Sequence, residues 1–218
     1  MNEGALSAGI AVLLVTVLAV VGPLLGVPSW LITLMVVVAL GGLTIDAASF
    51  SGRGGHLLAE ALPGGAGRLR RIAIHEAGHA LAAEADDLPV QRVLVGSLAC
   101  LQAGLSSGGC TEFEPPPQVR LPAEDLRRWS RVLQAGMVAE QLIYGESVGG
   151  ADDRALLGRL WGLSGFDVDT AQREQRRARR EVLSMLRERR ERLEEQAEAL
   201  LHQAPRLGRR RQVPSGPA

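Results

Sequence analysis

Hydrophobic residues follow two different patterns along this chain. Residues 5–27 and 29–45 carry no charged side chain, whereas from residue 68 onward apolar positions alternate with charged ones. Each uncharged run is about 17 to 23 residues long, and a helix needs about 20 apolar residues to cross the hydrocarbon layer of a bilayer. The pattern therefore predicts two membrane spans followed by a polar, folded domain.

The two uncharged runs are separated by a Pro/Gly-containing stretch, residues 22–28, which predicts a tight turn. The first four residues contain no basic side chain, which disfavours a secretory signal peptide. Basic residues such as Arg53 and Arg68 follow the second run, and positive charge stays on the cytoplasmic side. We therefore expect an integral membrane protein whose two ends and folded domain face the cytoplasm; a single bent span is the alternative.

The composition of the segments predicts four parts. Residues 1–46 form the helical hairpin, and the Gly/Ser-rich residues 47–67 form a linker. Residues 68–204 form the folded domain, and the basic residues 205–218 form a disordered tail.

The periodicity within the folded domain is mainly helical. Helices are predicted over 66–85, from Pro122 to 145, and over 169–203, and another helix begins after residue 150. Residues 90–95 and 110–113 have the β-branched and alternating character of strands. The expected fold class is mainly α, with a two-span hairpin followed by a predominantly helical domain that has a small β element.

The charge balance and the cysteine content exclude some functions. The chain has 218 residues with 24 basic and 24 acidic side chains, so its net charge does not favour nucleic acid as a partner. It contains no lysine, so the phosphate-binding loop G-x-x-x-x-G-K-[ST] cannot occur in it. Cys100 and Cys110 lack the spacing of a zinc ribbon and are interpreted as reduced, structural residues.

The stretch His75-Glu76-Ala77-Gly78-His79 indicates the chemistry of the folded domain. Positions i and i+4 share one face of a helix, so His75 and His79 can bind one metal ion. Zinc accepts two neutral imidazoles, a third protein ligand and a water, and Glu76 is then placed to take the proton of that water. The motif predicts a zinc-dependent hydrolase with Glu76 as its catalytic base. Gly78 is costly within a helix and predicts a close neighbour.

Two carboxylates can supply the third ligand. Glu140 lies on the helix that begins at Pro122, and Asp153 follows the glycine pair Gly149-Gly150 at a helix start. Glu140 could also be a buried carboxylate that hydrogen-bonds the non-ligating nitrogen of a ligand histidine. Asp152 and Asp153 could also cap the N-terminus of their helix. Spacing alone does not separate these alternatives.

Four blocks resemble the peptidase domain of the FtsH-type membrane proteases in order and spacing. They are residues 75–80, 89–93, 136–145 and 149–153, and the similarity covers about 68–203. The resemblance implies that His75, His79 and Asp153 hold Zn²⁺, and it leaves Glu140 as an alternative ligand or as a hydrogen-bond partner of a ligand histidine. It also implies unfolded or membrane proteins as substrates, contact with membrane lipid, and a homo-oligomer, which is a hexamer in that family.

Three departures qualify this resemblance. The family carries an ATPase between its spans and its peptidase, and here a short linker takes that place. An arginine and a serine of the family's motifs are replaced by Met137 and Ala151. We therefore expect a membrane-anchored zinc endopeptidase that cuts unfolded segments or uses an ATPase supplied in trans.

Two other functions compete with this one. A catalytically inactive pseudo-peptidase would act as a membrane scaffold or as a regulatory partner of an ATP-dependent protease, but it has no chemical need for Glu76. An intramembrane metalloprotease would carry its motif inside a span, but Arg70, Arg71 and Glu84 flank this one closely.

Overall fold

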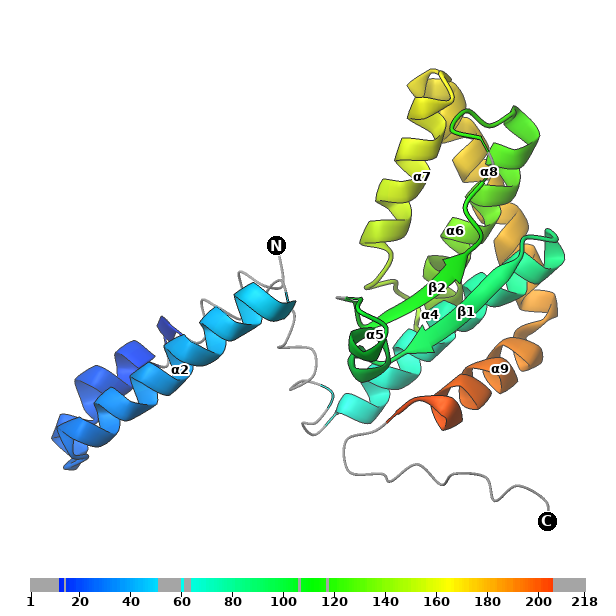
Figure 1. Ribbon diagram of the computed structural model, residues 1–218. Helices are drawn as coiled ribbons and strands as arrows, with labels where there is room; N and C mark the ends of the chain where they lie inside the picture. Colours follow the sequence, from blue (N-terminus) through cyan, green and yellow to red (C-terminus); the bar gives the residue numbers. More distant parts are fainter. Residues whose placement is uncertain are drawn as a thin grey trace, which may run out of the picture. The chain divides into compact units, whose positions relative to one another are not determined.

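The computed structural model describes residues 12–13, 15–50, 60, 64–105, 107–116 and 118–205 (Figure 1). The chain divides into two compact units, Met1–Leu62 and Pro63–Ala218. The predicted disordered tail lies outside the described residues apart from Pro205, and so do residues 51–59 and 61–63 of the predicted linker.

The first unit contains a turn between two helical segments. Residues 15–21 are helical, the 3₁₀ helix η1 spans Pro23–Leu25, and α2 spans Ser29–Phe50. Gly26 ends η1 with a φ of 75°, a left-handed conformation that glycine adopts without a Cβ clash. A Cβ at Gly22 would lie 2.8 Å from Cδ1 of Ile32, so the start of the turn packs directly on α2. The predicted turn at residues 22–28 is confirmed.

The membrane-spanning part of the predicted fold is wrong. Among the described residues, no helix combines the length and the apolar character that crossing a membrane requires. Among the described residues, the first helical segment ends at η1 and the turn at Gly26. The second half of α2 includes two adjacent glycines, a threonine and Asp46. The predictions of a two-span hairpin and of an integral membrane protein are both corrected by this finding.

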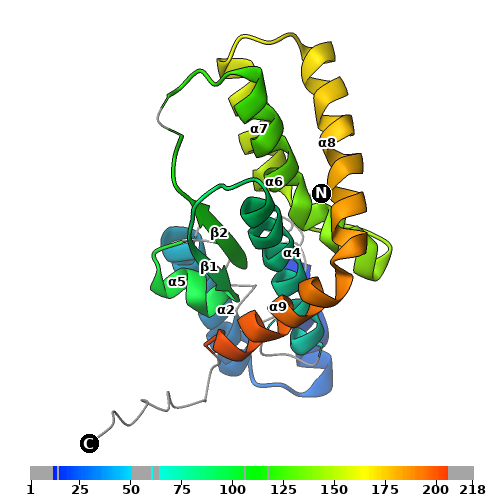
Figure 2. The same cartoon turned by 90° about the vertical axis from the view of Figure 1, so that its right-hand side faces the viewer.

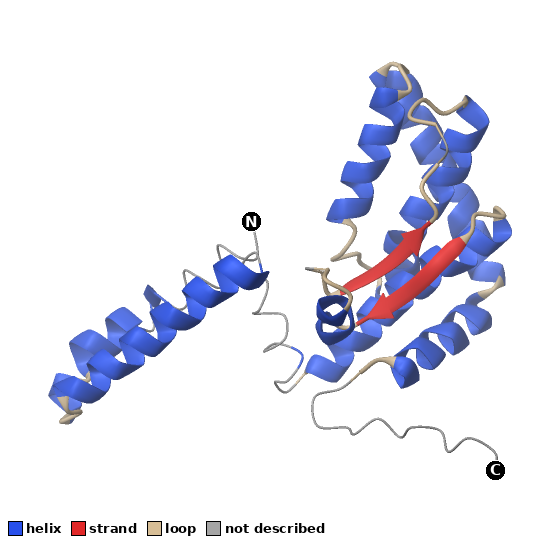
Figure 3. Cartoon of the chain, viewed as in Figure 1, coloured by secondary structure: helices blue, strands red, loops and turns tan. Residues whose placement is uncertain are grey.

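The second unit is a set of helices with one small sheet (Figures 1 and 3). The helical character and the small β element agree with the prediction for this part of the chain. Its elements are α4 (Gly65–Ala85), β1 (Val90–Val95), α5 (Ser97–Gln102), β2 (Gly109–Phe113), α6 (Ala123–Tyr144), α7 (Ala151–Leu163), α8 (Val168–Glu188) and α9 (Arg190–Gln203).

The two strands form an antiparallel pair. Val95 lies opposite Gly109, Val93 opposite Thr111, and Val90 opposite Phe113, with an irregularity in register between Val90 and Arg92. The chain reaches β2 from β1 through α5, a short helix that the sequence pattern did not predict. Both strands lie beside α4 (Figure 2), so the sheet covers one side of the helix that carries the two histidines.

The core of the second unit is built around α4 and α6. An unbroken run on α4, residues 73–83, is buried, and it packs against α6 on one side and α9 on another. A Cβ at Gly78 would lie 2.7 Å from the carbonyl oxygen of Ala135 and 2.7 Å from Cβ of Ala139. Gly78 therefore lets the two helices approach closely, and the neighbour predicted for it is the backbone of α6.

A second hydrophobic cluster lies along the N-terminal half of α6, where α7 packs. It is made of Leu121, Leu126, Trp129, Leu133, Leu157, Leu160, Trp161 and Ala171. The indole N–H of Trp161 donates to Oγ of Ser130 at 2.9 Å, so the one polar atom of this buried ring is satisfied. The cluster fixes α7 on α6.

The long C-terminal helix predicted over 169–203 is two helices. Arg189, with φ −110° and ψ 26°, leaves the helical conformation and separates α8 from α9. The break has a packing reason, because α8 lies along α6 whereas α9 lies along α4. Periodicity continues through the break, so the sequence pattern does not reveal it.

Candidate metal centre

The two histidines of the motif lie on the buried part of α4. The exposed fractions of His75 and His79 are 8% and 2%, and that of Glu76 is 5%. Three polar residues within five positions would be unfavourable in a hydrophobic core unless each had a partner. The partners come from α6, from β2 and from the start of α7.

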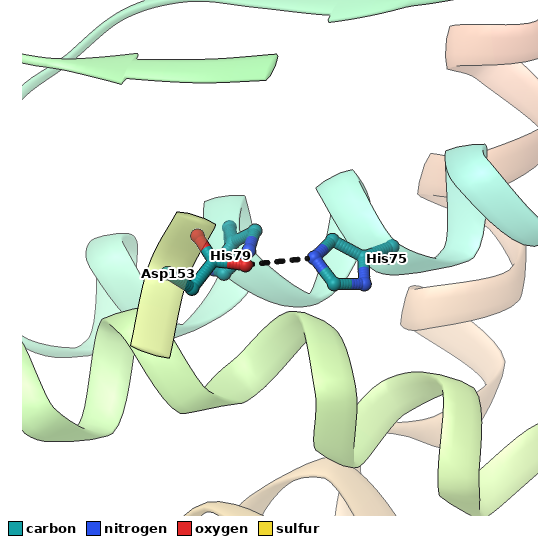
Figure 4. Close-up of side chains that lie close together, drawn as sticks. All are labelled: His75, His79 and Asp153. Carbon is teal, nitrogen blue, oxygen red and sulfur yellow. Dashed lines mark hydrogen bonds and ion pairs between the residues drawn. The ribbon is translucent and has the colours of Figure 1, made fainter. Parts of the chain in front are cut away.

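The structure brings Asp153 to both imidazoles (Figure 4). Its Oδ2 atom lies 3.2 Å from Nε2 of His75 and 3.4 Å from Nε2 of His79. The ligand atoms of the three residues all lie within 4.8 Å of one another. Asp153 reaches this point from the first turn of α7, which begins after Gly150, a residue in the left-handed conformation with φ 86°.

These separations fit a tetrahedral metal site. Ligand atoms at zinc distances of 2.0–2.2 Å occupy tetrahedral corners about 3.3–3.6 Å apart. The two distances from Asp153 to the imidazoles, 3.2 and 3.4 Å, are close to that edge length.

The other nitrogen of each imidazole is held by a hydrogen-bond acceptor. Nδ1 of His79 donates to the carbonyl oxygen of Val132 at 2.7 Å, and Nδ1 of His75 donates to Oε1 of Glu140 at 2.6 Å. A carbonyl and a carboxylate only accept, so each Nδ1 carries a proton and each Nε2 is the nitrogen left to face a cation, either a proton or a metal ion. This is the tautomer in which histidine binds a metal through Nε2.

Three acceptors therefore converge on one point. The two Nε2 atoms and the carboxylate oxygen cannot bond one another without a shared cation, either a proton or a metal ion. A Cβ at Gly136 of α6 would lie 2.4 Å from Nε2 of His75 and 2.5 Å from Nε2 of His79. Any other residue at position 136 would fill this space, so the donor set and the space beside it both fit zinc.

Glu140 lies on the opposite side of His75 from this point. Besides Nδ1 of His75, its carboxylate accepts the backbone N–H of Val148 at 2.9 Å and that of Gly149 at 3.3 Å. Arg71 lies 3.4 Å from its other oxygen. Glu140 thus orients one histidine and also fixes the loop that leads to Asp153. In this structure Asp153 lies at Nε2 of both imidazoles, whereas Glu140 lies at Nδ1 of His75.

The pKa values of the cluster reflect the shared cation. Burial lowers the pKa of His75, but hydrogen bonds to Asp153 and Glu140 outweigh it and raise that pKa to about 10. Burial raises the pKa of Asp153, yet hydrogen bonds from both imidazoles hold it well below its usual range. The pKa of Glu140 is likewise lowered, because His75 and two backbone N–H groups outweigh the effect of burial. Without a metal, the site favours a proton between His75 and Asp153.

Glu76 has a different environment. Its carboxylate accepts a hydrogen bond from Oγ1 of Thr111 on β2 at 2.7 Å. Burial raises the pKa of Glu76, although His79, His75 and Thr111 act in the opposite direction. A carboxylate whose pKa is raised is a stronger base, which is what proton abstraction from water needs.

Sequence reasoning missed Thr111 and gave Asp152 a role that it does not have. The only sequence feature that involves Thr111 is its place in the predicted strand at residues 110–113, and that feature does not indicate a contact with Glu76. Asp152 is exposed in the first turn of α7, outside the group of ligand atoms, and the N-cap of that helix is Gly150 with no side-chain cap bond.

Comparisons with known proteins assign the chain to no group. No protein-family model matches it, and no curated protein is significantly similar to it in sequence. A function for this chain therefore depends on the geometry of the site and on the motifs themselves.

Proposed function

We propose that this protein is a zinc-dependent endopeptidase. The observation that carries the proposal is the convergence of His75, His79 and Asp153 on one point. Nδ1 of each imidazole is held there by its own hydrogen-bond acceptor. The buried Glu76, one position along α4 from a ligand, supports hydrolysis as the chemistry.

The side chains of the site have separate tasks. When bound, zinc supplies Lewis acidity that lowers the pKa of a coordinated water to about 7 and polarises a peptide carbonyl. His75, His79 and Asp153 hold the ion, and Glu140 keeps the ring of His75 in its orientation. Glu76 accepts the proton of the attacking water and returns it to the leaving amine.

The choice of substrate comes from the resemblance to the FtsH-type peptidase domain. That resemblance supports cleavage of unfolded polypeptide, assembly into a homo-oligomer, and dependence on an ATPase supplied in trans when the substrate is folded. These are proposals about the chain, and each depends on the matched blocks between residues 75 and 153.

The test uses purified protein, an unfolded substrate and one variant. Zinc analysis should give about one equivalent per chain, and casein should be cut without ATP and spared after chelation. Glu76→Gln should keep its zinc and lose cleavage, because an amide cannot take the proton while both imidazoles remain.

Glu84→Gln is the matched control on the same helix. The side chain of Glu84 is 54% exposed and bonds Arg192 at the surface, so this variant should cut as the wild type does. Cleavage by Glu76→Gln at the wild-type rate would refute the mechanism. Zinc at full stoichiometry with no cleavage by the wild type would favour a scaffold instead.

A further inference from the structure

One face of β2 lies directly against the motif. Side chains two apart in a strand point the same way, so Gly109, Thr111 and Phe113 share a face. A Cβ at Gly109 would lie 2.7 Å from Oε1 of Glu76. The hydroxyl of Thr111 donates to Oε2 of Glu76, and the ring of Phe113 lies 6.3 Å from that of His79, nearly perpendicular to it.

This face combines three different properties. Gly109 leaves space for the carboxylate, Thr111 supplies a donor, and Phe113 supports a ligand ring. Cys110 and Glu112 alternate with them and belong to the opposite face, where Glu112 forms an exposed ion pair with Arg92 at 2.6 Å. The contact with α4 therefore depends on the register of β2.

The two oxygens of Glu76 are not equivalent. Oε2 accepts the hydrogen bond from Thr111, and Oε1 faces the open position at Gly109. A buried carboxylate with no donor could rotate about its last side-chain bond, because that bond has a broad preference. Thr111 fixes this rotation. Its own backbone is fixed in turn by pairing with Val93.

We propose that Thr111 is a positioning residue for Glu76, holding one carboxylate oxygen so that the other is directed to the proton it accepts. The inference rests on the proposed peptidase function. Thr111 bonds Glu76 and lies outside the group of ligand atoms formed by His75, His79 and Asp153, so its effect should be on turnover and not on zinc binding.

The test replaces the hydroxyl while keeping the shape. Thr111→Val should lower kcat about 10- to 100-fold, since small misplacements of a reacting group have effects of this size, and should leave KM within about twofold. Zinc stoichiometry and zinc Kd, measured by competition with a chromophoric chelator, should be unchanged. Thr111→Ser restores the donor and should recover most of kcat.

Glu112→Gln is the matched control, because it alters the opposite face of the same strand. It should leave kcat, KM and zinc Kd at wild-type values. If Thr111→Val does not fold, Thr111→Ala removes the same donor without the branched side chain, and the same fall in kcat is expected of it.

Two results would overturn the assignment. One is a wild-type kcat in Thr111→Val. The other is a loss of kcat that Thr111→Ser does not recover, or that is accompanied by an equal loss of zinc affinity, because either pattern indicates a structural role. The wild type and Glu76→Gln are assayed in parallel, so failure of the peptidase proposal itself is seen separately, as a wild type without cleavage.

Discussion

The histidine ligands and the aspartate ligand reach the same point from differently built parts of the molecule. His75 and His79 lie on a helix within the main core, and each ring is held at Nδ1. Asp153 comes from α7, which packs in the second hydrophobic cluster, and 22% of its side chain is exposed against 10% and 2% for the histidines. The histidines form a preorganised half-site, and Asp153 completes it from a separately packed element.

This difference assigns separate roles to the two halves. The imidazoles are oriented by contacts that exist without a metal, so they set where an ion binds. Asp153 is held mainly by the imidazoles themselves and by the loop that Glu140 fixes, so its position depends more on the ion. A bound metal would therefore link the two hydrophobic clusters. Four experiments examine this contrast, beginning with the largest expected effect.

Asp153→Ala should purify without zinc and without peptidase activity. Removing this carboxylate leaves two protein ligands, and catalytic zinc sites use three. The protein should still fold, because Asp153 lies at the edge of the site and the α4–α6 core is untouched. Metal analysis together with circular dichroism checks both points. Full zinc in this variant would show that the histidine half-site is sufficient.

Zinc affinity should rise with pH, by about 100-fold between pH 6 and pH 8 if one proton is released. The pKa of His75 is raised to about 10 in the metal-free protein, so this ring is protonated throughout that interval. Zinc must displace the proton, and the competition weakens as the pH rises towards that pKa. Calorimetry in buffers of different ionisation enthalpy measures the proton released. A zinc Kd independent of pH would contradict the shared-cation description of the site.

Glu140→Gln should weaken zinc affinity about 10- to 100-fold without abolishing binding. Changes of this size are typical when a residue that hydrogen-bonds a metal ligand is replaced. The amide loses the charge that holds His75, and its NH₂ group cannot accept from the loop amides. Glu146→Gln is the control, since its side chain is 73% exposed and lies 3.6 Å from Arg71 at the surface. Full zinc in Asp153→Ala with none in Glu140→Gln would reverse the two roles.

Asp152→Ala should have the smallest effect. Its side chain is exposed and lies outside the group of ligand atoms, so zinc binding should be unchanged. The loss of an acidic group from the first turn of α7 should lower the free energy of unfolding by about 0.3–1 kcal/mol. Urea denaturation of the metal-free protein measures it. A loss of zinc would show that the neighbouring aspartate is the wrong choice.

Local pattern was sufficient for part of the fold and of the site. The helix over 66–85 and the strands at 90–95 and 110–113 were predicted to within a residue or two, from local hydrophobic patterns and residue types. His75, Glu76 and His79 follow from the repeat of one helix, so their shared face needed no tertiary information.

The remainder depends on tertiary contacts. Whether Glu140 or Asp153 meets the imidazoles at Nε2 depends on which side of a ring each approaches, and spacing along the chain does not encode that. The break at Arg189 follows from two packing partners, α6 and α4. The membrane spans were predicted from the lack of charged residues alone, and no helix among the described residues has both the length and the apolar character of a span. Thr111 became visible only through the register of β2 against α4.

The two loop amides bonded to Glu140 have a practical consequence for spectroscopy. The N–H groups of Val148 and Gly149 both point at a buried carboxylate that also holds a ligand ring. Their amide protons should resonate downfield, and their ¹⁵N–¹H signals should shift when an ion changes the charge on that ring. Isotope labelling alone therefore provides a sensor of the metal centre that needs no substrate and no substitution.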